Sequence, residues 1–365
     1  MLLILAGITI NLTIGQRGIL NRAQEAGRNY QEAAKREDEQ LTNFLKETDD
    51  IIDGLGGQSK PLPENALAKK VEIGDYVAYN PKAGVTDESK LSYTSPVGTG
   101  SSHGNGYTDI PEGQTFTVEE NTKWRVLSKD ETTGEVVLIS EAPMHQFGMD
   151  GAIGYLYFEQ ELNEICKIYG YGKGANTSKT FTYETGDTVE GLTKGRITGS
   201  GGRSITAEDI NKITKYDPST FTDEFNGIID RYGDSYTHTI FYPTKATQNG
   251  ASTSATERTD KFTAYYYQGS EYLTDTTSVI YQILFENGYW VASRGVEARF
   301  EGAGFYGFFV AGPYVQPYGL CSGGPDKLVV NDVDDVVVGV RPVVYLKSNI
   351  QTSAKDASGA WIISE

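Results

Sequence analysis

The stretch that most restricts the fold of this chain is Tyr289–Leu346, because its middle combines aromatic residues with glycines. The rings there are Phe300, Phe305, Tyr306, Phe308, Phe309, Tyr314 and Tyr318. Solvated loops contain few rings, and core strands contain few glycines because glycine has no side chain to pack. We therefore expect an irregular Gly-rich backbone that carries aromatic side chains on a binding surface. The alternative is that the rings fill a loop-rich core.

Ordered strands are expected on both sides of this aromatic middle. Residues 289–294 (YWVASR) alternate as a strand does when it enters a core, with Trp290 packing inward. Residues 338–346 (VGVRPVVYL) are rich in β-branched residues, and Pro342 indicates an edge or irregular position. The strands expected at residues 289–294 and 338–346 would therefore hold the backbone of the surface that lies between them.

The composition disfavours several classes of function. The 365 residues include 32 Lys and Arg against 49 Asp and Glu, so the net charge is −17, and an acidic chain repels nucleic-acid phosphates. Two cysteines cannot form a disulfide framework, and whether Cys166 and Cys321 pair stays open. Three histidines leave little room for a metal centre, and His145 beside Met144 and Met149 has too few ligands. We expect no catalysis, cofactor, metal or nucleic-acid partner, whereas the 24 tyrosines favour a contact surface.

The N-terminus carries no charge before Arg17. This run of about 16 apolar or neutral residues is shorter than the about 20 that span a membrane, and it has no basic leader. It continues into an amphipathic pattern with helical period, so a helix is predicted over residues 1–55. Glycines and prolines then predict a linker over residues 56–70.

The middle of the chain changes from helical to strand-like patterns. Residues 71–79 predict a strand, and 122–141 predict two strands around a turn at 132–134. Residues 155–170 predict a helix, and a second helix is expected to begin near Thr206.

Three further segments have weaker patterns. Residues 215–275 are interpreted as an insertion or long loops, and 351–365 as a C-terminal tail. The acidic residues of 331–335 do not have the spacing of an EF-hand, and a solvated loop is favoured over a calcium site.

The N-terminal pattern resembles the type IV pilin-like architecture. The matching residues are Leu2, Leu3, Ile4, Leu5, Ala6, Gly7, Ile8 and Ile10. The resemblance implies a helix that is embedded in a membrane or packed in a fibre core, with other pilin subunits as partners and a location at the cell surface. The alternative is a plain membrane anchor or a buried core helix.

The C-terminal pattern resembles the variable proteins of diversity-generating retroelements. The matching frame is Tyr289, Trp290, Ala292, Ser293, Arg294, Val296, Phe305, Val310, Val315, Leu320, Val340, Arg341, Pro342, Val343, Val344 and Leu346. The resemblance implies an α+β fold, in which the long pilin-like helix precedes a C-type-lectin-like (formylglycine-generating-enzyme-like) domain over 71–350. That domain would contain an irregular antiparallel sheet and two helices, with a variable region at about 289–346.

The same resemblance implies that the chain binds a protein or glycan on another surface, through side chains rewritten by an error-prone reverse transcriptase. The candidate residues are Gly295, Glu297, Arg299, Phe300, Gly302, Gly304, Tyr306, Phe308, Phe309, Gly312, Tyr314, Gln316, Pro317, Tyr318, Cys321 and Ser322. Most fit substitution of AAC codons, but Glu297 and Gln316 do not. Two alternatives stay open: a structural minor pilin without a ligand, and an enzyme of the formylglycine-generating type, which would need neighbouring reactive cysteines.

Overall fold

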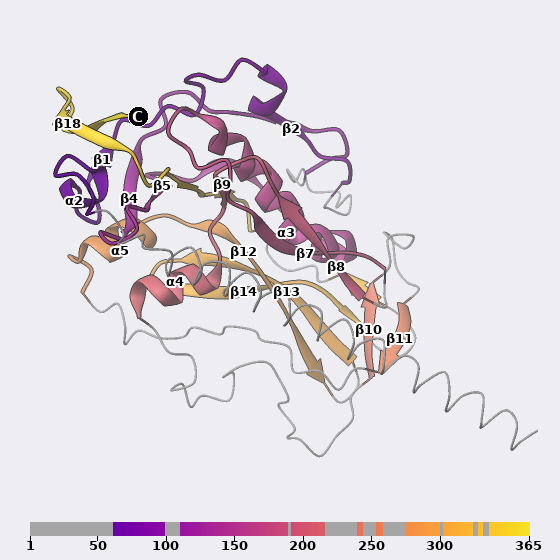
Figure 1. The fold of residues 1–365 in the computed structure, drawn as a ribbon. Helices are drawn as coiled ribbons and strands as arrows, with labels where there is room; N and C mark the ends of the chain where they lie inside the picture. Colours follow the sequence, from indigo (N-terminus) through magenta and orange to yellow (C-terminus); the bar gives the residue numbers. More distant parts are fainter. Residues whose placement is uncertain are drawn as a thin grey trace, which may run out of the picture. The chain divides into compact units, whose positions relative to one another are not determined.

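The computed structural model describes residues 61–98, 110–188, 191–215, 239–243, 253–257, 275–299, 302–323, 328–330 and 336–365 (Figure 1). Strands dominate these residues, which contain two large sheets and three two-stranded sheets. The α-helices among them are α2 (Leu67–Lys70), α3 (Gly151–Lys167), α4 (Ala207–Thr214) and α5 (Val279–Leu284), and α3 alone is longer than eight residues. Short 3₁₀ turns are η1 (Glu88–Leu91) and η2 (Ile168–Tyr171).

The expected α+β class, with a C-type-lectin-like domain of an irregular sheet and two helices, is therefore wrong for the described residues, which are mostly β. The physical reason is that segments expected to be irregular or loose pair as strands and complete their backbone hydrogen bonds there. The predicted helix over 1–55 lies outside the described residues.

The first large sheet has seven strands. Their order is β18 (Gln351–Lys355), β19 (Trp361–Ser364), β1 (Tyr76–Val77), β4 (Trp124–Lys129), β5 (Val136–Ser140), β17 (Pro342–Tyr345) and β9 (Gly202–Ser204). The predicted tail 351–365 thus forms two strands of this sheet. The end of the predicted linker likewise forms α2, with Leu67 and Ala68 buried.

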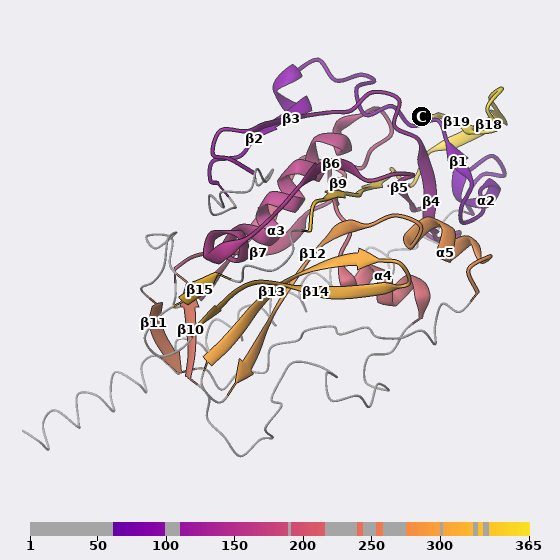
Figure 2. The same cartoon turned by 180° about the vertical axis from the view of Figure 1, so that it is seen from behind.

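The second large sheet has six strands, and its three longest lie side by side (Figure 2). Their order is β15 (Leu328–Val330), β14 (Tyr314–Gly323), β13 (Gly302–Ala311), β12 (Tyr289–Arg299), β16 (Val338–Val340) and β6 (Met144–Phe147). The two-stranded sheets are β2 (Ser92–Thr94) with β3 (Thr115–Thr117), β7 (Phe181–Thr188) with β8 (Gly191–Ile197), and β10 (Thr239–Pro243) with β11 (Thr253–Glu257). The last of these sheets lies within the predicted insertion 215–275.

Local sequence signals explain several elements. The turn between β4 and β5 forms where predicted, because the Asp130 carboxylate accepts the backbone N–H groups of Thr132 and Thr133, and Gly134 takes φ +81°. Helix α4 begins with a capping box in which Thr206 and Asp209 exchange hydrogen bonds, as the sequence indicated. The predicted strand over 71–79 is reduced to the two residues of β1.

The chain crosses from the six-stranded to the seven-stranded sheet at Arg341, between β16 and β17. The Arg341 guanidinium is buried and donates hydrogen bonds to the carbonyls of Ser140, Glu141 and Ile283. Of the two positions expected for Pro342, the edge is wrong, because β17 lies between β5 and β9, whereas the chain does leave a regular strand immediately before it, at Arg341. Proline is accommodated there as the first residue of the strand.

Both faces of the six-stranded sheet are covered near β12. On one face Trp290 and Leu320 pack with Phe158 and Leu162 of α3. On the other face the core includes Tyr289, Val291, Phe308, Val310 and Val315 of the sheet, Ile210 of α4 and Val343 of β17. This arrangement holds β12, β13 and β14 between α3 and the rest of the core.

Candidate ligand-binding surface

Strands β12, β13 and β14 carry nearly all the residues predicted to bind a ligand. They pair antiparallel from Tyr289↔Val310 to Arg299↔Gly302 and from Ala303↔Gly323 to Ala311↔Tyr314. The prediction of an irregular backbone is therefore wrong, because these residues form paired strands of ten or eleven residues. The pairing register shifts at two places, between 291 and 294 and between 305 and 306.

Gly307 fits a regular strand because a large side chain occupies the space beside it. A Cβ atom on Gly307 would lie 2.2 Å from a ring carbon of Phe158 on α3. Gly307 pairs with Tyr318 and with Arg294, and Gly319 pairs with Tyr306. The glycine at 307 thus permits close packing of α3 on the sheet and does not break the strand.

The predicted support beneath the strands is present. Trp290 is fully buried, and its Nε1 donates to the carbonyl oxygen of Phe147 at 3.0 Å. Its ring meets those of Phe158, Phe309 and Tyr318 edge-on, with centroids 5.6, 5.9 and 5.7 Å away. Such T-shaped contacts stabilise a defined ring arrangement beyond simple burial.

A second anchor joins β12 to α3. Arg294 is buried, and its Nη1 donates to the carbonyl oxygen of Tyr155 at 2.9 Å. Its Nε lies 3.9 Å from Glu159 Oε1, and its guanidinium carbon lies 4.9 Å from the centre of the Tyr155 ring. These contacts fix the position of β12 relative to α3.

The aromatic residues predicted for the surface divide into two groups. Tyr306, Phe309 and Tyr314 are partly exposed, as a binding surface requires. Phe308 is fully buried and Tyr318 is 7% exposed, so their assignment to the surface is wrong. The reason is strand geometry, because successive side chains point to opposite faces and both faces are covered near β12.

Several of the predicted site residues that are accessible lie close to the turn of the β13–β14 hairpin. Phe309 pairs with Gln316, and Ala311 pairs with Tyr314, with the exposed Gly312 in the turn at φ +58°. We call these five residues the hairpin surface. Alternate pairs of an antiparallel ladder share one face, so these two pairs lie next to each other.

For most of the other predicted site residues the structure describes the position in the strand ladder. Gly295, Glu297 and Arg299 lie on β12 opposite Tyr306, Gly304 and Gly302, and Ser322 on β14 lies opposite Gly304. Cys321 pairs with Phe305 in the ladder, and Pro317, which is partly exposed, pairs with Phe308. Phe300 lies outside the described residues, as does the acidic segment 331–335.

Two buried groups were missed by the sequence reasoning. Glu161 on α3 is fully buried; it accepts a hydrogen bond from the Tyr93 hydroxyl at 2.8 Å, and burial raises its pKa to about 7. Its position between Phe158, Leu162 and Ile165 falls on the helical period of the apolar face, a signal that could have revealed it. The other group is the ion pair of Arg203 with Asp209, and nothing local in the sequence indicates it.

Cys166 and His145 both lie in contact with other side chains in the described part of the chain. Cys166 is a free thiol, fully buried, and burial raises its pKa, which opposes thiolate formation. His145 lies between Glu119 Oε1, 3.2 Å from Nδ1, and the Tyr169 hydroxyl, 2.9 Å from Nε2. Burial lowers the His145 pKa, and within the described ranges no three His, Cys, Asp or Glu side chains gather as metal ligands.

Searches against known proteins return no relatives: no protein family, no curated protein and no solved structure matches this chain. Among the helices in the described residues, none has the length and apolar character needed to cross a membrane.

Proposed function

We propose that this chain is a cell-surface binding protein that recognises a macromolecular ligand, a protein or a glycan, through β12–β14. The observation that carries the proposal is the alternation along the β13–β14 hairpin. Buried Phe308, Val310 and Val315 alternate there with the accessible Phe309, Tyr314 and Gln316. Rigid aromatic anchors beside adaptable polar residues are typical of surfaces that bind macromolecules.

The hairpin is suited to accepting substitutions. Its backbone is held by main-chain hydrogen bonds between β12, β13 and β14, which do not depend on side-chain identity. Arg294 ties β12 to Tyr155 of α3, and Trp290 donates to Phe147 of β6 while its ring packs against Phe158 of α3. Accessible positions can therefore change while the strands keep their place, which is the property that a retroelement-diversified protein needs.

The remaining parts of the proposal rest on the sequence. The resemblance of residues 1–55 to pilin-like helices supports attachment to a membrane or a pilus, with other pilin subunits as partners. The buried thiol of Cys166 gives the rival formylglycine-type enzyme no support.

The first test compares this locus in sibling strains. We expect amino-acid differences to concentrate at Tyr306, Phe309, Tyr314, Gln316 and Pro317, with Phe308 and Val310 constant. A near-identical copy of the DNA for 289–346 should lie beside a reverse-transcriptase gene. Differences spread evenly along the chain, or changes at buried positions, would contradict diversification.

The second test measures binding. Two full-length chains that differ only at the accessible hairpin positions are applied to the same printed glycan and protein arrays. We expect them to bind different spots, whereas a control pair that differs at Glu112, an exposed residue outside the strands, should bind the same spots. Identical patterns for both pairs, or no binding by either, would favour a structural pilin without a ligand.

A further inference from the structure

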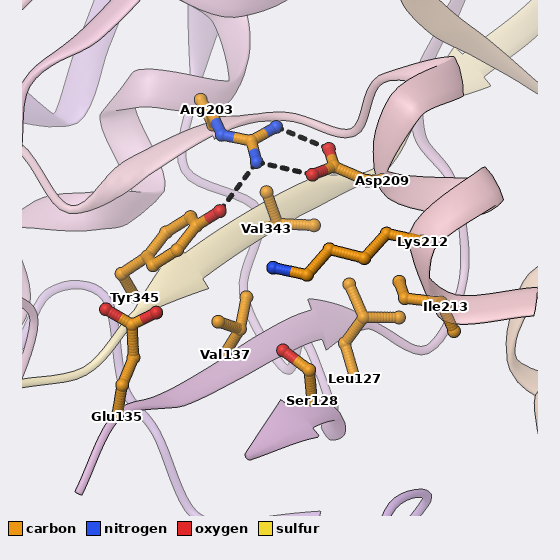
Figure 3. Close-up of a pocket in the computed structure, with 10 residues that line it drawn as sticks. All are labelled: Leu127, Ser128, Glu135, Val137, Arg203, Asp209, Lys212, Ile213, Val343 and Tyr345. Atoms are coloured by element: carbon orange, nitrogen blue, oxygen red, sulfur yellow. Dashed lines mark hydrogen bonds and ion pairs between the residues drawn. The ribbon is translucent and has the colours of Figure 1, made fainter. Parts of the chain in front are cut away.

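A second site, separate from the β12–β14 surface, lies between α4 and the seven-stranded sheet (Figure 3). It is a cavity of about 90 Å³. Its apolar floor is formed by Leu127 of β4, Val137 of β5 and Val343 of β17, all buried, with Ile213 of α4 at one side. Polar groups form the remaining wall and rim: Ser128, Glu135, Arg203, Asp209, Lys212 and Tyr345.

One wall is held rigidly by an ion pair. Arg203 of β9 binds both carboxylate oxygens of Asp209 at 2.6 and 2.8 Å, and donates to the Tyr345 hydroxyl at 2.6 Å. Burial alone would raise the pKa of Asp209, but the Arg203 charge outweighs it and holds that pKa below its usual value. Asp209 also caps α4 through Thr206, so the same carboxylate joins the helix to the sheet.

The opposite rim is also charge-balanced. Glu135 forms an ion pair with Lys179, whose Nζ lies 4.5 Å from the centre of the Tyr345 ring. The Arg203 guanidinium lies 5.3 Å from the centre of the same ring. Tyr345 thus lies near two cations, each of which is paired with its own carboxylate.

Lys212 differs from the other charged residues that line the cavity, because it is not part of an ion pair in the described chain. It follows Asp209 by one turn of α4, and Figure 3 shows its side chain extending into the cavity toward Tyr345. It is exposed, and it forms no ion pair with any residue that the structure describes. Arg203 is paired with Asp209 and Glu135 with Lys179, so Lys212 is the lining residue whose charge has no ion-pair partner among the described residues, in a chain whose net charge is −17.

We propose that this cavity binds a small organic monoanion: a carboxylate with a short apolar body. The apolar body lies on Leu127, Val137 and Val343, and the carboxylate meets Lys212 Nζ. The single unpaired ammonium group of Lys212 matches one carboxylate group. The small volume excludes bulky ligands.

The test titrates the full-length chain with butyrate and with butyramide, which has nearly the same shape and no charge, by ligand-observed NMR at low salt. We expect butyrate to bind saturably and butyramide to bind about fivefold more weakly or worse. The variant Lys212→Met, which keeps an apolar side chain over the floor, should lose butyrate affinity by a similar factor. Lys212→Arg should retain binding, and added salt should weaken it.

The matched control is Lys215→Met, at the C-terminus of the same helix and outside the cavity, which should bind butyrate as the unmodified chain does. Equal affinity for butyrate and butyramide, equal effects of the two lysine substitutions, or no saturation would overturn the proposal. In those cases the Lys212 stem serves to cover the apolar floor and binds no anion.

Discussion

Strand β5 of the seven-stranded sheet and the β13–β14 hairpin of the six-stranded sheet share one backbone geometry and differ in what covers them. All five residues of β5, Val136–Ser140, are buried, because one core cluster packs on Val137 and Ile139 and another on Val136 and Leu138. Along the hairpin, buried residues alternate with accessible ones. The difference shows that a regular ladder can serve either as an invariant core or as a platform for changeable side chains, depending on the layers packed against it.

The largest expected effect tests whether the buried half of the hairpin is as well packed as β5. Phe308→Ala should lower the free energy of unfolding by about 4 kcal/mol, because it removes a fully buried ring, and Leu138→Ala in β5 should cost about 3 kcal/mol. Urea denaturation of both variants measures this. A cost below about 1 kcal/mol for Phe308→Ala would mean that the hairpin is loosely packed and the comparison with β5 fails.

The next effect concerns the attachment of α4 to the seven-stranded sheet. Asp209→Asn leaves the Arg203 charge without its partner and should cost about 3 kcal/mol at pH 7. Because the Asp209 pKa is lowered in the folded state, its stabilisation is present above the unfolded value of 3.8 and is lost as the pH falls through the folded value. Urea denaturation at pH 7 and pH 3 should therefore show a smaller difference between variant and unmodified chain at pH 3. A constant difference would contradict this role for Asp209.

A third effect concerns the pH dependence of stability through Glu161 of α3, the helix that covers one face of the hairpin strands. The pKa of Glu161 is raised to about 7 in the folded state, against 4.5 for an ordinary glutamate. The folded chain thus holds a proton that the unfolded chain releases, and this stabilisation is complete below about pH 4.5 and is lost as the pH rises through about 7.

Stability should therefore fall by on the order of 3 kcal/mol between those pH values through this group. Glu161→Gln should remove that dependence, since the amide stays neutral and can still accept from Tyr93. Thermal unfolding across this pH range measures it, with Glu112→Gln at an exposed site as the control. An unchanged pH dependence in Glu161→Gln would show that Glu161 ionises normally.

The smallest effect is expected at the accessible half of the hairpin. Tyr314→Ala and Gln316→Ala should each change the free energy of unfolding by less than about 1 kcal/mol, because both side chains are partly exposed and the ladder does not depend on them. The same urea titration measures this. Losses comparable to that of Phe308→Ala would erase the distinction between the two halves of the hairpin.

Local signals in the sequence predicted the β4–β5 turn, helix α3, the start of α4 and the strand that begins at Tyr289, because each depends on neighbouring residues such as Gly134 and Thr206. The β class, the strands of the expected tail and the interior position of Pro342 were missed, since each depends on pairing with distant segments. For the candidate surface, the sequence located the right stretch. It could not separate Phe308 and Tyr318 from Phe309 and Tyr314, because glycine content alone suggested an irregular backbone.

By itself, the sequence determined that a Gly-rich aromatic stretch lies between two strands and that Trp290 enters the core. Only the tertiary structure decided which rings face water, because α3 covers one side of β12–β14 and the core with α4 and β17 covers the other. It also decided that Lys212 stands unbalanced beside two balanced ion pairs, since Arg203, Asp209, Glu135 and Lys179 meet through the fold. Burial and charge balance are properties of contacts between distant segments, and periodicity along the chain does not encode them.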